Sequence, residues 1–166
     1  MTHKTCAMLA LAAALAPAAL AQNSAAARAQ IRRGIDTYMR SVDLADPNLA
    51  ATVWLTTPDV SFISPVGHDR GWDQVADDIY VKLMGQTFSK RHLTAKAEPV
   101  IHVYNGDAAV AEFDWDFVAT LRSNGSQVHT TGRESQVYIR FPDKGWRLVH
   151  VHYSGPAVPP PSSGRF

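Results

Sequence analysis

The sequence predicts an α+β fold in which N-terminal helices pack on a strongly curved antiparallel sheet. Up to about residue 88 the apolar side chains recur at helical spacing, whereas after Ser89 they alternate with the period of two that strands require. Two Asn-Gly pairs, at 105–106 and 124–125, separate the alternating segments and are strong signals for hairpins. Because the helices come first, we expect them to cover one face of the sheet.

The composition describes one folded domain and excludes several classes of function. The chain has 166 residues, of which 46% are hydrophobic and 19% charged, so it is too apolar for a disordered chain. A formal net charge of +1 provides no general attraction to nucleic acid or to a membrane surface, and neither is an expected partner. The single Cys excludes an intramolecular disulfide and a Cys-rich zinc module. No glycine-rich phosphate loop is present, and we expect no cofactor.

The first 21 residues have the organisation of a signal peptide. Lys4 precedes an Ala/Leu-rich run at 7–16, which is too short to span a bilayer because a spanning helix needs about 20 residues. Ala19-Leu20-Ala21 then supplies the small residues that a signal peptidase recognises. We therefore expect cleavage after Ala21 and a periplasmic or secreted protein. The predicted organisation is a signal peptide at 1–21, one domain at 22–157 and a Pro-rich tail at 158–166.

Each element before residue 89 has its own sequence signal. Apolar residues at helical spacing predict an amphipathic helix over 25–44. Asp46 and Pro47 are typical of an N-cap followed by the first helical position, which predicts a short helix that ends before Pro58. The other elements expected here are a short strand at 60–64, a turn that contains His68, and a helix that begins near Trp72 and has its C-cap at Gly85.

The alternating segments predict a four-stranded antiparallel meander at 92–104, 108–121, 127–141 and 146–153. Strand 108–121 has an aromatic face and an acidic face. Either the aromatic face packs on the helices and the acidic face meets water, or the polar face lines a cavity and the aromatic face is a subunit interface. Periodicity alone favours the first arrangement. The two sets are Phe113, Trp115 and Phe117 on one face, and Glu112, Asp114 and Asp116 on the other.

The C-terminal segments resemble a known family. The run Gly-Arg-Glu-Ser-Gln-Val-Tyr at 132–138 and the run at 145–156, which contains Val-His-Val-His-Tyr-Ser-Gly, are similar to the terminal signature of SnoaL-like domains in the nuclear transport factor 2-like superfamily. Within that superfamily they most resemble the association (hub) domain of calcium/calmodulin-dependent protein kinase II. The resemblance covers 28–157. It implies a cone-shaped α+β fold with a pocket between helices and sheet, and oligomers built through the sheet.

The resemblance also changes the expected orientation of the sheet. The pocket arginines of the hub domain align with Asp116, Gln136 and Tyr153, which implies that these three residues converge on the cavity and that the polar face is the inner one. In such a cavity desolvation and like charge would raise the pKa of Asp116, as a general base requires. The alternative is that Asp116 pairs with an arginine and has no chemical role.

Two classes of function follow, and whether the chain is an enzyme is left open. The first is an exported domain that binds a small organic ligand in the pocket and self-associates through its sheet as a dimer or a ring of dimers. The second is a cofactor-independent acid–base enzyme of isomerase, cyclase or hydratase type, with Asp116 as base and Tyr153 as hydrogen-bond donor. The expected ligand contacts are Trp54, His68, Tyr80, Glu134, Gln136 and Tyr138. The expected interface consists of Phe113, Trp115, Phe117, Val137, Ile139, Trp146 and Leu148.

A metal site is not expected. His150 and His152 have a spacing that zinc sites use, but no third ligand is evident. We therefore interpret both histidines as core or interface residues.

Overall fold

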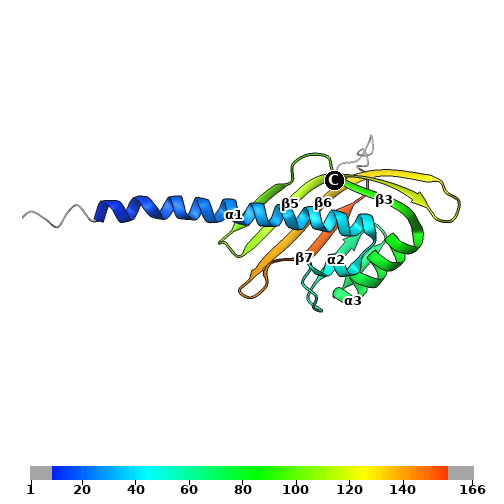
Figure 1. The fold of residues 1–166 in the computed structure, drawn as a ribbon, viewed down its shortest axis with the longest axis horizontal. Coiled ribbons are helices and arrows are strands. Elements are labelled where there is room, and N and C mark those ends of the chain that lie inside the picture. Colours follow the sequence, from blue (N-terminus) through cyan, green and yellow to red (C-terminus); the bar gives the residue numbers. More distant parts are fainter. Residues whose placement is uncertain (1–8, 157–166) are drawn as a thin grey trace, which may run out of the picture.

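The computed structural model describes residues 9–156, and the side chains of 23–156, so the predicted Pro-rich tail lies outside the described residues. It confirms an α+β fold with N-terminal helices that cover one face of a sheet (Figure 1). The helices are α1 (Leu9–Leu44), α2 (Pro47–Ala51), α3 (Trp72–Gln74) and the π-helix η1 (Val75–Thr87). The strands are β1 (Ser61–Ser64), β2 (Gly67–Arg70), β3 (Phe88–Ala95), β4 (Val100–Tyr104), β5 (Ala108–Leu121), β6 (Gln127–Phe141) and β7 (Gly145–Ser154).

The first two helices follow their sequence signals. The predicted helix over 25–44 is the C-terminal part of α1, which runs along the sheet and extends beyond it (Figure 1). Its buried face consists of the apolar residues at helical spacing, among them Ile31, Ile35 and Tyr38. Asp46 caps α2 as predicted, because its side chain accepts hydrogen bonds from the backbone N–H groups of Asn48 and Leu49.

The third helical segment is longer than predicted. Helix α3 continues into η1, which passes Gly85 and ends at Thr87. The C-cap expected at Gly85 is therefore wrong. The helix ends instead where Phe88 adopts an extended backbone and starts β3, which pairs with β5.

The sheet is mixed rather than wholly antiparallel. Its strand order is β2-β1-β7-β6-β5-β3, and β4 also pairs with β5. All pairs are antiparallel except β1 with β7, which run parallel. The predicted strand 92–104 is two strands, interrupted at 96–99, where Pro99 is buried and lacks the N–H that a ladder requires. The predicted turn at His68 is instead the short strand β2.

The two Asn-Gly pairs form hairpin turns as predicted. Asn105 and Gly106 both have positive φ angles, 50° and 82°, and join β4 to β5. Gly125 has a φ of 74° in the turn between β5 and β6. These turns allow β5 to pair with β4 over 108–112 and with β6 over 108–120.

The register of β5 on β6 turns the aromatic face inward. Trp115 lies opposite Gly132, and Phe113 lies opposite Glu134. Because directly opposed residues project from the same face, Glu134 shares the inner face with the aromatic side chains. The acidic set points outward. The expectation that the polar face lines the cavity is therefore wrong, and the arrangement favoured by periodicity alone is the observed one.

A bulge in β7 changes the faces of its C-terminal half. Val137 pairs with His150 while Tyr138 pairs with Leu148, so Val149 is an extra residue in β7. Strict alternation would place Leu148 and Val151 on opposite faces, but both are buried. The same shift places Tyr153 on the inner face beside Glu134 and leaves both histidines of the strand on the outer face.

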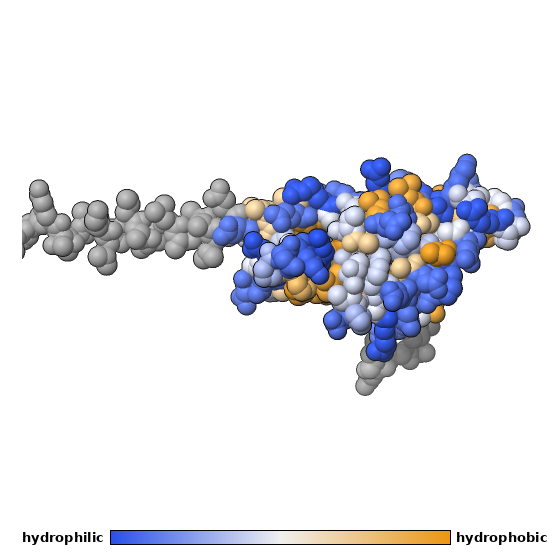
Figure 2. Space-filling model, turned by 60° about the horizontal axis from the view of Figure 1, so that its bottom comes forward, coloured by the Kyte–Doolittle hydropathy of each residue, from blue (hydrophilic) through white to orange (hydrophobic). Residues whose placement is uncertain are grey.

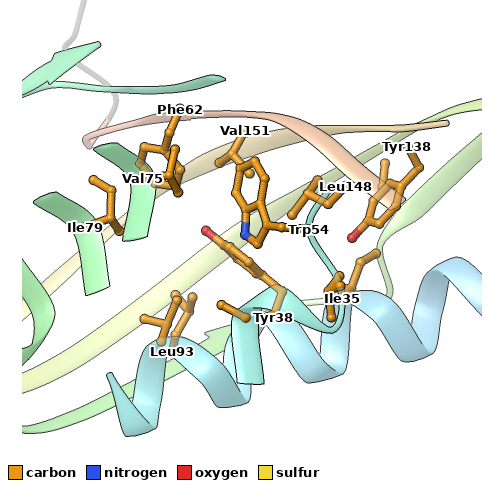
Figure 3. Close-up of a cluster of buried hydrophobic side chains, with 14 of the residues drawn as sticks. Ile35, Tyr38, Trp54, Phe62, Val75, Ile79, Leu93, Tyr138, Leu148 and Val151 are labelled. Atoms are coloured by element: carbon orange, nitrogen blue, oxygen red, sulfur yellow. The ribbon is translucent and has the colours of Figure 1, made fainter. Parts of the chain in front are cut away.

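The core lies between α1, η1 and the inner face of the sheet. Figure 3 shows Trp54, Phe62 and Val151 with side chains from the helices around them. Five of the seven residues expected in a subunit interface are in this core, because they belong to the inner face: Phe113, Trp115, Phe117, Trp146 and Leu148. Val137 and Ile139 lie on the outer face and are half-buried.

Gly132→Ala is expected to destabilise the protein. A Cβ at position 132 would lie 2.5 Å from Trp115 Cζ2 and would also meet the backbone oxygen of Ser154. Since a backbone atom cannot swing away, we expect a loss of about 2–3 kcal/mol in the free energy of unfolding, measured by urea denaturation. Gly67→Ala is the control, because a Cβ there meets nothing within 4 Å. Equal stability of the two variants would contradict the packing described for Trp115.

Candidate functional site

A largely apolar cavity of about 150 Å³ lies between the helices and the inner face of the sheet. Helices α1 and η1 form one side, and β1, β3, β5, β6 and β7 form the other. Its aromatic wall consists of Tyr38, Phe62, Phe88, Trp115, Phe117 and Tyr153. Val42, Ile79, Leu83, Met84, Leu93, Val128, Thr130 and Glu134 complete the lining. Glu134 is therefore the only acid among the described residues around this cavity, and none of them is Lys, Arg or His.

Glu134 is buried on β6, with 5% of its surface exposed. Burial raises the pKa of its carboxyl group from about 4.5 to about 7, and hydrogen bonds from Gln136 and Tyr38 limit that rise. At neutral pH the protonated and ionised forms therefore both occur. Glu134 can accept or donate a proton under conditions in which an exposed glutamate is always ionised.

A chain of hydrogen bonds holds Glu134 in place. The Gln136 Nε2 amide donates to Glu134 Oε1 over 2.7 Å, and the Tyr138 hydroxyl donates to Gln136 Oε1 over 2.6 Å. Gln136 and Tyr138 are almost completely buried. Since both hydrogen bonds point toward the carboxylate, this chain stabilises its negative charge without supplying a positive one.

Two tyrosines on the cavity wall supply hydroxyl groups near the carboxyl group. Burial and the nearby Glu134 raise the pKa of Tyr38 well above its usual value, and burial also raises the pKa of Tyr153. Both phenols therefore stay protonated at neutral pH and can donate hydrogen bonds. The Tyr153 ring makes edge contacts with Trp115 and Phe62, at centroid distances of 5.7 and 5.6 Å.

Asp116 does not reach the cavity. It lies on the outer face of β5, where Oδ1 is 2.8 Å from Nε2 of His129. The expectation that Asp116, Gln136 and Tyr153 converge is thus wrong for Asp116, whereas the other two residues lie on the inner face next to Glu134. The alternative prediction was that Asp116 pairs with an arginine. Asp116 does lie beside a basic side chain, but that side chain is His129.

The turn between β5 and β6 contains a sequence signal for the face on which Glu134 lies. A hairpin loop with an even number of residues always pairs an odd-numbered residue with an even-numbered one. A two-residue turn at Asn124-Gly125 meets this condition and would place Trp115 and Glu134 on the same face. The observed ladder, in which Thr120 pairs with Gln127, keeps the same parity. Tyr38 was also missed as a site residue, because its helical spacing indicates only a core position.

Of the six predicted ligand contacts only Glu134 lines the cavity, because Gln136 and Tyr138 are buried behind its wall and the other three lie elsewhere. Trp54 and Tyr80 are fully buried, and Trp54 Nε1 donates a hydrogen bond to the Tyr80 hydroxyl over 3.2 Å. Both pack in the core beside the cavity rather than on its wall. His68 is exposed on β2, where its Nδ1 lies 3.2 Å from a guanidinium nitrogen of Arg70.

The described residues contain no cluster of three or more His, Cys, Asp or Glu side chains that could hold a metal ion. His150 on the outer face lies 2.8 Å from the Ser61 hydroxyl, and burial lowers its pKa. Within 9–156, none of the helices combines the length and the apolar character needed to cross a membrane.

Comparisons with known proteins agree with this architecture. A nuclear transport factor 2-like superfamily protein from Salmonella enterica serovar Typhimurium LT2 is 51% identical, with a TM-score of 0.82 over 86% of this chain and 99% of that one. Hexachlorocyclohexane dehydrochlorinase LinA-type3 from Novosphingobium barchaimii LL02 is 15% identical, with a TM-score of 0.71 over 87% and 97% of the two chains. At that identity the likeness shows the fold alone. The comparison with curated proteins found no match.

The family model for the SnoaL-like domain matches residues 23–152, which is most of the chain. The matched segment contains α1 from residue 23 onward, the whole cavity lining except Tyr153, and the aromatic inner face of the sheet. The chain therefore belongs to the SnoaL-like domain family, within the nuclear transport factor 2-like superfamily.

Proposed function

We propose that this SnoaL-like domain binds a small organic molecule in the 150 Å³ cavity, with Glu134 as its polar contact. The observation that carries the proposal is a buried carboxyl group on an otherwise apolar and aromatic wall. Ligand sites have this character, because apolar walls supply affinity and a few polar groups fix orientation. An apolar cavity of about this volume accepts a molecule the size of benzene.

Acid–base catalysis at Glu134 is a second candidate function. A specific observation favours it, because the pKa of Glu134 is raised to about 7 and proton transfer is efficient when the pKa lies near the working pH. Tyr153 would donate a hydrogen bond to an oxygen that becomes negative during the reaction, while the single O–H of Tyr38 is bonded to Glu134. The dehydrochlorinase among the structural neighbours is an enzyme with the same fold, but the fold does not transfer its reaction. In this form of the hypothesis Glu134 replaces Asp116 as the base.

We further propose that the mature protein is exported and self-associates through the outer face of the sheet. The ordered charged, apolar and Ala-x-Ala segments of 1–21 support export. The resemblance to the hub domain supports assembly through the sheet. The outer face offers Val137, whose cross-strand partner is Val110, together with Ile139. Figure 2 shows that one side of the surface mixes hydrophilic side chains with small apolar areas.

Filling the cavity is expected to weaken ligand binding strongly. Val128 lines the cavity from β6, so Val128→Phe places a ring in the space that a ligand would occupy. We expect titration calorimetry with benzyl alcohol to detect binding to the wild type and at least about tenfold weaker binding to this variant. Val118→Phe is the control, because Val118 is 40% exposed on the outer face. Equal affinity in both variants, or none in the wild type, would contradict the proposal.

The titration of Glu134 is expected to make the protein less stable as the pH rises. Its pKa is about 7 in the folded state and near 4.5 when unfolded, so the folded state binds the proton more tightly. Its full contribution to stability is present below about pH 4.5 and is lost as the pH rises through 7, by about 3 kcal/mol in all. Urea denaturation at pH 5 and pH 8 should show this loss in the wild type and in an exposed control, Glu112→Gln. Glu134→Gln should remove most of it, and an unchanged pH dependence in that variant would contradict the assignment.

The exported protein is expected to begin at Gln22 and to contain more than one chain. N-terminal sequencing of the protein from the periplasmic or culture fraction checks the first part, and light scattering on that protein checks the second. Val137→Glu should reduce the mass to one chain, because it puts an unpaired charge into a desolvated contact. Val66→Glu is the control, since Val66 is 76% exposed between β1 and β2. A product that starts at Met1 excludes cleavage, and a wild-type mass of one chain excludes the assembly.

A further inference from the structure

We propose that the natural occupant of the cavity is a small organic cation, such as a protonated amine on a body about the size of benzene. This inference rests on the proposed function, because it names the class of ligand for the same site. It follows from the charge of the one acidic group in the cavity and from the chemistry of the walls around it.

Glu134 is a buried carboxyl group without a countercharge. Its hydrogen-bond partners, Gln136 and Tyr38, are neutral. Among the described residues Glu134 takes part in no ion pair, and no basic side chain lines the cavity. Buried charges in proteins are normally paired, since removing an ion from water is costly unless an opposite charge compensates it. A cationic ligand would supply the missing partner.

The aromatic walls favour the same class of ligand. The negative faces of aromatic rings attract cations, most strongly where water is excluded. Trp115 and Tyr153 flank the Glu134 position, since Trp115 is opposite Gly132 and Tyr153 is opposite Glu134 itself. The rings of Trp115 and Tyr153 meet at 79°, and those of Phe88 and Phe117 meet at 76°. Both are edge-to-face pairs, and all four side chains line the cavity.

The same features of the cavity disfavour anionic and neutral ligands. A carboxylate or phosphate ligand would meet the ionised Glu134 without any basic residue on the described walls to compensate it. A neutral ligand with a donor hydrogen fits the volume and can bond to Glu134, but it leaves the carboxylate charge unpaired. The inference therefore predicts an order of affinity in which the cation binds best, the neutral isostere less well and the anion worst.

Three probes of similar shape test this order: benzylammonium, benzyl alcohol and benzoate. Titration calorimetry on the purified protein at pH 8 and constant ionic strength should give at least about tenfold tighter binding of benzylammonium than of benzyl alcohol, with benzoate weakest. This comparison uses only the wild type, so it does not depend on a variant folding. Equal or tighter binding of benzyl alcohol, or preferential binding of benzoate, would overturn the inference and leave the proposed ligand site standing. Failure of all three probes to bind would overturn both.

Glu134→Gln identifies the group responsible for the preference. This change removes the charge and keeps the shape, so benzyl alcohol should retain its affinity within about threefold while benzylammonium loses its advantage. Glu112→Gln is the matched control, because Glu112 is exposed on the outer face of β5, and it should bind both probes as the wild type does. A preference for benzylammonium that persists in Glu134→Gln would assign it to another part of the molecule and overturn the inference.

Discussion

The pairing of β5 with β6 in a single register is the constraint on which the rest of the structure depends. A shift by one residue would exchange the faces of β5, so that Phe113, Trp115 and Phe117 would meet water and three carboxylates would enter the core. Burying a large aromatic side chain stabilises a protein by about 1.5–3 kcal/mol, and burying an unpaired carboxylate costs several. The alternative register is therefore strongly disfavoured. The observed register also brings Glu134 onto the aromatic face, where its carboxyl group lines the otherwise largely apolar cavity.

Three features of its environment set the pKa of Glu134, and one of them opposes the other two. Removal from water disfavours its ionised form, while the amide of Gln136 and the hydroxyl of Tyr38 favour that form. Their balance leaves the pKa near neutrality. A carboxyl group in this condition responds strongly to whatever occupies the cavity, because a positive charge would stabilise the ionised form and an apolar group would stabilise the protonated one. If a ligand binds in the cavity as proposed, its binding and the binding of a proton to Glu134 would therefore be coupled.

The outer face of the sheet has the opposite chemistry. Its carboxylates lie next to basic groups of β6, as Asp114 does with Arg133 at 3.6 Å and Asp116 with His129 at 2.8 Å. These pairs are largely exposed, so solvent screens them and they contribute little to stability. The proposed interface uses the half-buried Val137 and Ile139 instead. One strand pair thus separates the face for which we propose ligand binding from the face for which we propose assembly.

The sequence by itself determined the α+β class, the cap of α2, the two Asn-Gly hairpins and the family, because each depends on local residue chemistry or on a contiguous motif. It also predicted Glu134, Gln136 and Tyr138 as ligand contacts, and these three residues alternate along β6 on its inner face. It did not reveal the bulge at Val149, the split of 92–104 into two strands or the parallel pairing of β1 with β7, since these are decided by partners distant in the chain. The site itself required the tertiary structure. Desolvation of Glu134 arises only when α1, η1 and four neighbouring strands close around it, and no local pattern records that enclosure.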